Sequence, residues 1–263
     1  MGVVNVTPDS FSDGGQFTST EEAIAHGLRL VSEGARIVDI GGESTRPGAE
    51  PVSAREQIER TAGVIRGIRE RSDCLISIDT TLQPVAASAL DAGADIINDI
   101  SGGMGDEAML PFLAQNDSGY VMMHMQGNPA TMQLNPSYAD PVKEIHSFFS
   151  ERLSVMDSQG IERERVVLDP GIGFGKTLHH NLMIMDQLAN FFDFERPVLI
   201  GASRKSFINA VSPAPVSLRL GGSIAAALQS ATRGAHILRV HDVLATRQAL
   251  DIFAAIAHPE DYI

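Results

Sequence analysis

The chain alternates short apolar, β-rich runs with longer stretches of helical character, and this alternation limits its possible folds more than any other feature. Runs of strand length occur about eight times, at residues 3–6, 37–40, 75–78, 96–97, 120–123, 166–169, 198–200 and 236–240. Strands that alternate with helices build a parallel sheet with crossovers of one hand. About eight of them favour a single closed (β/α)8 TIM barrel over an open doubly wound sheet.

Caps and breakers place the helices between these runs. Ser19 with Glu22, and Ser53 with Glu56, have the spacing of a capping box at a helix start. Helices are expected over about residues 19–33, 53–71, 84 onward, 107–115, 141–159, 181–188, 217–232 and up to 256. A chain of 263 residues with 43% hydrophobic content buries one large core, so we expect one domain over residues 1–263.

A weak internal repeat supports the barrel. Each of its three copies has a helix-ending glycine, two apolar strand residues, and a polar residue five positions after the glycine. The glycines are Gly34, Gly93 and Gly234, and the polar residues are Asp39, Asn98 and Arg239. A common Gly-Ala joint between helix and strand explains the glycines but not the polar residues. The shared offset predicts that these three side chains lie at similar heights on their strands.

The net charge argues against two classes of partner, and the cysteine content excludes an internal disulfide. The net charge of -13 argues against nucleic acid or an anionic membrane as a partner, so an anionic ligand requires a local basic cluster. The single cysteine, Cys74, excludes an internal disulfide, is expected to be buried before a strand, and fits a cytoplasmic protein. The sequence shows no apolar stretch of membrane-spanning length and no secretion signal.

Residues 166–177 combine a buried strand with a carboxylate and a glycine-rich loop. Pro170 cannot donate to a sheet, so the strand should end at Asp169. Glycines at alternate positions let the backbone pass close to a ligand, with Phe174 between them. Residues 175–177 match the end of a nucleotide-binding loop, but that motif needs a glycine where Pro170 stands. We therefore predict a ligand site that binds neither ATP nor NAD through this loop.

Polar side chains mark the carboxyl ends of most predicted strands. They are Asn5, Asp79, Asn98, His124, Asp169, Lys205, Arg239 and His241. In a barrel these ends converge on the face that carries active sites, so we predict the active site there.

Chemistry suggests roles for these groups. Asp79 and Asp169 need hydrogen-bond donors at partly desolvated strand ends, and a flat heterocycle with amine and amide N–H groups would supply them. Asp79 has a second interpretation, as the cap of the following helix. Arg239 and the side chains around it suit an anion, since Arg contacts phosphate in a bidentate manner.

Three further interpretations concern single residues. For Arg204 we expect a structural salt bridge. Asn5 and Asp9 offer oxygen ligands to a magnesium ion. Met123 is expected to contact a planar ligand.

Eight motifs together resemble dihydropteroate synthase, a family of pterin-binding enzymes. They are residues 5–15 (NVTPDSFSDGG), 42–48 (GESTRPG), 78–80 (IDT), 97–99 (IND), 123–127 (MHMQG), 169–176 (DPGIGFGK), 203–206 (SRKS) and 239–242 (RVHD). The likeness runs in order from the first residues to the last predicted strand.

The resemblance implies a (β/α)8 barrel transferase of folate biosynthesis that forms a C–N bond. Such an enzyme joins (7,8-dihydropterin-6-yl)methyl diphosphate to 4-aminobenzoate and releases diphosphate with magnesium. It also implies inhibition by sulfonamides, which mimic 4-aminobenzoate, and a homodimer. The alternatives are a pterin-dependent methyltransferase and a non-catalytic pterin-binding paralogue, and 4-aminobenzoate-dependent diphosphate release would separate both from the synthase.

The resemblance also implies roles by position. The residues implied to hold the pterin are Asp79, Asn98, Ile100, Met123, Asp169 and Lys205. Those implied at the 4-aminobenzoate pocket are Thr45, Arg46, Pro47, Phe174 and Ser206, with Phe11 and Asp13 on a first loop that closes over it. Those implied at the diphosphate are Asn5, Arg239 and His241, with Asn5 also a magnesium ligand. Asp79, Asp169, Lys205, Arg239 and His241 are implied to be catalytic.

The first residues depart from the family pattern. Members usually carry a short segment before this strand, and Met1-Gly2 stands where it would end. Either the chain is truncated or its start is misassigned, and we expect a less well covered barrel floor and lower stability.

Overall fold

The computed structural model describes residues 1–6, 16–44 and 50–262 of the chain. Eight short strands alternate with helices along these residues, as the sequence predicts. The strands are β1 (Gly2–Asn5), β2 (Ile37–Gly41), β3 (Leu75–Asp79), β4 (Ile96–Asp99), β5 (Gly119–Met123), β6 (Val166–Asp169), β7 (Leu199–Ile200) and β8 (Ile237–Leu238).

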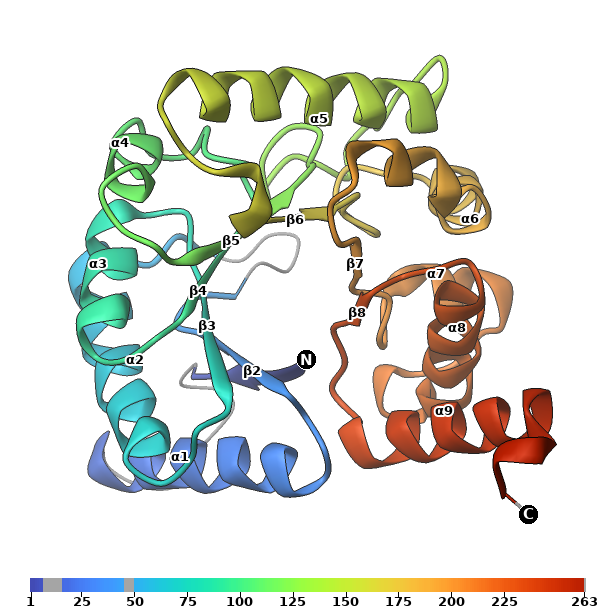
Figure 1. The fold of residues 1–263 in the computed structure, drawn as a ribbon, viewed down its shortest axis with the longest axis horizontal. Helices are drawn as coiled ribbons and strands as arrows, with labels where there is room; N and C mark the ends of the chain where they lie inside the picture. The colour runs from blue at the N-terminus through green and yellow to red at the C-terminus, as the bar shows by residue number, and fades with distance from the viewer. Residues whose placement is uncertain (7–15, 45–49, 263) are drawn as a thin grey trace.

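The strands form a ring of parallel neighbours (Figure 1). β1 to β6 pair in chain order, and β7 pairs with β8. Single parallel bridges join the two groups, between Leu168 and Val198 and between Gly2 and Val240. Backbone hydrogen bonds support the second seam, including Val3 N to Val240 O at 3.1 Å. The molecule is therefore a closed (β/α)8 barrel with two short seams.

Helices surround this ring (Figure 1). They are α1 (Gln16–Ser32), α2 (Ala54–Arg69), α3 (Gln83–Asp91), α4 (Met109–Leu113), α5 (Pro141–Ser158), α6 (Leu178–Asp186), α7 (Ser206–Val211), α8 (Leu220–Thr232) and α9 (Val243–Ala257). Short 3-10 helices are η2 (Arg163–Arg165), η3 (Leu188–Phe194), η4 (Val216–Leu218) and η5 (Pro259–Tyr262). Within the described ranges, no helix is long and apolar enough to cross a membrane.

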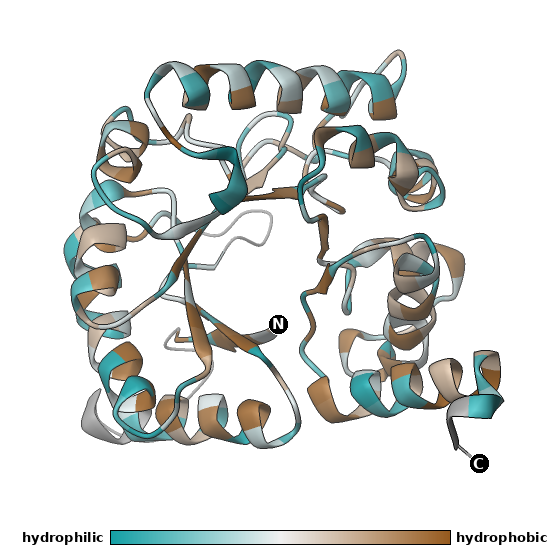
Figure 2. Ribbon diagram, viewed as in Figure 1, coloured by the Kyte–Doolittle hydropathy of each residue, from teal (hydrophilic) through white to brown (hydrophobic). Residues whose placement is uncertain are grey.

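The hydrophobic core lies between the strands and the helices. In Figure 2 the strands are mostly brown, while most helices carry both brown and teal segments. Ile76 and Ile78 of β3 and Ile65 of α2 are fully buried in this layer. Phe149 of α5 packs edge-on against Phe191 of η3, with ring centroids 5.6 Å apart, and so closes the core beside β6 and β7. Packing in this layer holds the strands in place, and with them the polar residues at the strand ends.

Several sequence predictions need correction. α1 begins at Gln16, so Ser19 lies within the helix and not at its start. Ser53 does cap α2, since its Oγ accepts the backbone N–H of Glu56 at 3.3 Å. Cys74 is half-buried, not buried, because it precedes β3 at the rim of the core. α7 was not predicted, because six residues are too few to show a helical period.

Candidate functional site

The sheet register places the polar strand ends at one level. Asp79 at the end of β3 pairs with Asn98 of β4 and with Gly41 of β2. Asp169 at the end of β6 pairs with Met123 of β5. Because parallel strands in register end on the same face, these side chains gather at one mouth of the barrel.

Arg239 joins the polar residues of the internal repeat into one network. Its Nε donates to Asp39 Oδ2 at 2.6 Å and its Nη2 donates to Asp79 Oδ2 at 2.7 Å. Asn98 Nδ2 donates to the same Asp39 oxygen at 3.1 Å. The other oxygen, Asp39 Oδ1, is buried without a hydrogen-bond partner among the described residues. The predicted convergence of Asp39, Asn98 and Arg239 is confirmed.

Burial sets the electrostatics of this network. It raises the pKa of Asp79, and Asp39 and Asp99 add to the increase while Arg239 opposes it. Burial alone would lower the pKa of Arg239, but the carboxylates of Asp39 and Asp79 raise it above its usual range. The alternative of Asp79 as a helix cap is wrong, because α3 begins without a side-chain cap and Asp79 pairs with Arg239.

Asp169 is held by the turn that follows it. Its Oδ1 accepts the backbone N–H of Gly171 at 2.7 Å, and only 6% of the residue is exposed. Burial raises the pKa of Asp169, while the charge of Lys205 and this N–H oppose the increase. A second buried carboxylate therefore lies at the mouth.

Lys205 reaches the same region from the end of β7. Its ammonium donates to the carbonyl of Ile172 and lies 4.5 Å from the centroid of the Phe174 ring. Burial lowers the pKa of Lys205 to about 8, although the charges of Asp169 and Asp79 oppose this and Arg239 adds to it. Lys205 thus links the glycine-rich loop to the carboxylates.

His241 and Arg204 lie beside this group. His241 Nδ1 is 3.0 Å from Ser203 Oγ, and burial lowers the pKa of His241 to about 4, with Arg239 and Arg204 adding to the decrease. The imidazole is therefore neutral at pH 7. Arg204 pairs with Asp242 through Nε at 2.9 Å and Nη2 at 2.5 Å, which confirms the expected salt bridge.

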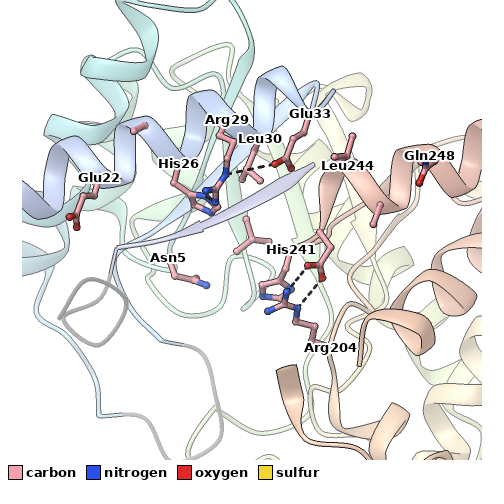
Figure 3. A pocket seen from close by; sticks show the side chains of 14 residues that line it. Asn5, Glu22, His26, Arg29, Leu30, Glu33, Arg204, His241, Leu244 and Gln248 are labelled. Atoms are coloured by element: carbon pink, nitrogen blue, oxygen red, sulfur yellow. Dashed lines mark hydrogen bonds and ion pairs between the residues drawn. The ribbon is translucent and has the colours of Figure 1, made fainter. Parts of the chain in front are cut away.

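A cleft of about 1000 Å³ opens between β1, α1 and α9 (Figure 3). Asn5 and His241 lie at one end of it, together with the Arg204–Asp242 pair. The cleft is lined by Val3, Asn5, Glu22, Ala25, His26, Arg29, Leu30, Glu33, Arg204, His241, Asp242, Leu244, Ala245 and Gln248. Two of the three residues predicted for diphosphate therefore face one open space, while Arg239 is bound to the carboxylates.

The remaining predicted residues divide into two groups. Ile100 and Met123 are buried at the ends of β4 and β5, and Ser206 is exposed at the start of α7. Phe11, Asp13, Thr45, Arg46 and Pro47 lie outside the described residues, as does Asp9. The predictions for those six residues stay predictions.

The metal prediction concerns Asn5. Within residues 1–6, 16–44 and 50–262, no group of three or more His, Cys, Asp or Glu side chains could hold a metal ion. Magnesium commonly takes one or two protein oxygens and fills its other positions with water and substrate phosphate. The half-buried amide of Asn5 beside the cleft fits that partial role.

Sequence reasoning gives no site role to four supporting residues, although the internal repeat places Asp39 among the strand ends. Asp39 accepts from Arg239, and Ser203 contacts His241. Asn181 of α6 accepts the N–H of Gly173 at 2.7 Å, and Lys176 is buried beneath the glycine-rich loop. The internal repeat was the available signal for Asp39. For the other three, no local sequence pattern pointed to the contact.

Sequence comparisons place this chain in a known family. The model of the pterin binding enzyme family matches residues 1–241. Dihydropteroate synthase of Escherichia coli (strain K12) is 44% identical over 255 residues, which cover 97% of this chain and 90% of the relative. The enzyme of Haemophilus influenzae is 43% identical over 258 residues, which cover 98% and 94%.

Solved structures give the same result. Yersinia pestis dihydropteroate synthase in a sulfonamide drug complex matches with a TM-score of 0.92 and 42% identity, covering 98% of this chain and 93% of that chain. Xanthomonas albilineans dihydropteroate synthase with 4-aminobenzoic acid matches with a TM-score of 0.92 and 43% identity, covering 98% and 92%. The same enzyme with 7,8-dihydropteroate matches with a TM-score of 0.88 and 40% identity, at the same coverage.

Proposed function

The chain belongs to the pterin-binding enzyme family, in which its relatives are dihydropteroate synthases, and we propose how its residues carry out that reaction. The enzyme condenses (7,8-dihydropterin-6-yl)methyl diphosphate with 4-aminobenzoate to give 7,8-dihydropteroate and diphosphate. The observation that carries the proposal is the network at the strand ends, in which Arg239 connects Asp79 to Asp39 and Asn98.

Asp79, Asn98 and Asp169 are the proposed acceptors for the N–H groups of the pterin. Asp79 and Asp169 are buried or nearly so at the ends of β3 and β6, where a carboxylate without a donor is costly. The buried Ile100 and Met123 would pack against the flat ring, and Lys205 would donate to its acceptor edge. Arg239 and the N–H of Gly171 also donate to these carboxylates, at Asp79 and Asp169 respectively.

The second substrate is proposed to lie between the pterin and the glycine-rich loop. Phe174 offers a flat face beside Lys205, and Ser206 starts the next helix. Thr45, Arg46 and Pro47 would complete the pocket, with Phe11 on the first loop, by resemblance alone. Sulfonamide drugs would occupy the same pocket, as suggested by the drug complex of the Yersinia pestis relative.

Diphosphate is proposed to bind at the end of the cleft near Asn5 and His241. Arg239, which pairs with the carboxylates of Asp39 and Asp79, would also attract the negative charge of the diphosphate. Magnesium held by Asn5 would neutralise negative charge on the leaving diphosphate. Asn5 supplies the oxygen chemistry that this ion prefers.

The proposed reaction is a single displacement, in which the amine of 4-aminobenzoate replaces diphosphate on the pterin. The C–O bond to diphosphate breaks, the amine nitrogen of 4-aminobenzoate forms the new C–N bond, and that nitrogen releases a proton. Positive charge that develops on the pterin is stabilised by Asp79 and Asp169. Arg239 and His241 stabilise the departing anion, and no side chain needs to act as a covalent nucleophile.

The other two functions considered from the sequence are less well supported. A pterin-dependent methyltransferase needs neither an aminobenzoate pocket nor a diphosphate site. A non-catalytic paralogue would be expected to lack some polar strand ends, yet Asp79, Asn98, Asp169, Lys205, Arg239 and His241 are all present. The relatives matched over nearly the whole chain are synthases.

A homodimer through α6–α9 is the proposed assembly. Ten of the thirteen exposed large apolar side chains among the described residues lie on α6, α7, η4, α8 and α9. These elements are neighbours in Figure 1, and a concentrated apolar surface of this kind marks protein interfaces. The second copy is the proposed occupant because such interfaces are self-complementary in symmetric dimers. A cytoplasmic location, based on the single cysteine, stays a prediction.

The decisive experiment measures diphosphate release from the pterin diphosphate with magnesium, with and without 4-aminobenzoate. We expect release that requires 4-aminobenzoate in the parent chain. In Lys205→Ala we expect a loss of kcat/KM of roughly 100-fold or more, because a half-buried charged donor at the site is lost.

Two comparisons make this result specific. Lys143→Met removes an exposed lysine of α5 and should leave the rate unchanged. A chelator should abolish release if the magnesium proposal holds. Pterin binding without any release would contradict the synthase reaction and favour the non-catalytic alternative.

A further inference from the structure

The loops that follow β5 and β6 pack backbone against backbone at the mouth of the barrel. Gly171 has φ of 70°, and a Cβ there would lie 2.0 Å from the carbonyl oxygen of His124. Gly175 has φ of 61°, and a Cβ there would lie 2.4 Å from the carbonyl oxygen of Gln126. No side chain fits at either place, so the two loops hold each other's position.

Side chains of the β5 loop also donate to the carbonyls of the glycine-rich loop. Gln133 Nε2 donates to Gly173 O at 2.6 Å, and Tyr138 Oη donates to Gly175 O at 2.9 Å. The segment that carries Phe174 is therefore held by side chains of the β5 loop at two points, the residues before and after it.

The buried side chain of Lys176 also connects the same two loops. Its Nζ lies 3.0 Å from His124 Nδ1, 3.3 Å from His124 O and 3.0 Å from Phe174 O, and only 3% of the residue is exposed. An ammonium group has three N–H donors, and these three acceptors use all of them. Lys176 therefore has no donor left for a substrate.

The electrostatic surroundings shift the pKa of both partners in this contact. Burial lowers the pKa of His124 to about 3, and the charge of Lys176 adds to this, so the ring is neutral and its Nδ1 can accept. Burial lowers the pKa of Lys176 to about 7, with Lys205 adding and Asp169 opposing. Asp169, Lys205, His124 and His180 are titratable groups that interact with Lys176 in this region.

We propose that Lys176 is a positioning residue, which fixes the loop from Gly171 to Phe174 against His124 and so sets the places of Asp169 and Phe174 for the two substrates. The inference rests on the proposed function for its kinetic consequences. Its structural part, the bond from Lys176 to His124, stands without it. Lys176 acts through Gly171, whose N–H holds Asp169, and through the carbonyl of Phe174.

Lys176→Met tests this inference because methionine has similar length and no donor. We expect a folded protein with KM raised about tenfold for both substrates, since the loop loses charged hydrogen bonds. A purely structural role would lower the melting temperature and leave both KM values of the folded protein unchanged. The matched control is Lys143→Met, which should leave KM unchanged.

A second measurement does not depend on activity. Nuclear magnetic resonance titration of the His124 imidazole should show a higher pKa in Lys176→Met than in the parent chain, because a neighbouring positive charge is removed. Calorimetric binding of the pterin diphosphate should weaken in the same variant. If the parent released no diphosphate, the proposed function would fail while these two results still tested Lys176.

Tyr138→Phe is the second variant, in case Lys176→Met does not fold. It removes only the hydroxyl that donates to Gly175 O and should raise KM for 4-aminobenzoate by a smaller factor than Lys176→Met. Unchanged KM values in the folded variants, or an unchanged His124 titration in Lys176→Met, would overturn the inference.

Discussion

At the scale of single residues, backbone conformation is most restrictive at Gly171. Its positive φ and the His124 carbonyl together forbid a side chain. We expect Gly171→Ala to lower the free energy of unfolding by roughly 2–5 kcal/mol, the sum of left-handed strain and a steric clash. Urea unfolding measures this change directly.

Gly160 provides the matched control. Its φ is 78°, close to that of Gly171, but a Cβ there would meet nothing within 4 Å. Gly160→Ala should therefore show only the strain, about 1–2 kcal/mol. Equal losses in the two variants would show that contact with His124 does not limit residue 171.

At the scale of elements, α6 takes its starting point from a capping box directly after the glycine-rich loop. Thr177 Oγ1 accepts the N–H of His180 at 3.2 Å, and the N–H of Thr177 contacts His180 Nδ1 at 3.3 Å. We expect Thr177→Ala to lower the free energy of unfolding by about 1 kcal/mol, measured by urea unfolding, because the helix loses its cap.

Thr177→Ser separates the hydroxyl from the methyl group. Serine keeps the acceptor and is as good a cap as threonine, so its stability should stay close to that of the parent. If serine and alanine lowered stability equally, the hydroxyl would not be the stabilising group.

At the scale of the whole molecule, the apolar surface over α6–α9 governs assembly. Leu218 of η4 is 72% exposed, and Leu134 outside this surface is 81% exposed. We expect Leu218→Glu to weaken the proposed dimer at least tenfold in sedimentation equilibrium, because a charge would be buried at the interface. Leu134→Glu should leave the association unchanged. Equal association in both variants would place the dimer interface elsewhere.

Local signals in the sequence predict the order of strands and helices, and with it the barrel. Alternating apolar runs and caps are local signals, so β1 to β6 and most helices could be placed within a few residues. The polar residues at the strand ends could be named as well, because parallel strands must end on one face. α7 escaped prediction because it is shorter than two helical turns.

The pairing of those residues follows from the folded chain and cannot be predicted from local sequence. The sequence predicts an anion as the partner of Arg239, yet Arg239 also pairs with Asp39 and Asp79, which lie 200 and 160 residues away. Lys176 contacts His124 across 52 residues, and nothing in either local sequence shows that bond. Hydrogen bonds between distant strands depend on the register and closure of the ring. Local propensity determines where helices and strands form, whereas the arrangement of the strands in the barrel determines which distant side chains form hydrogen bonds.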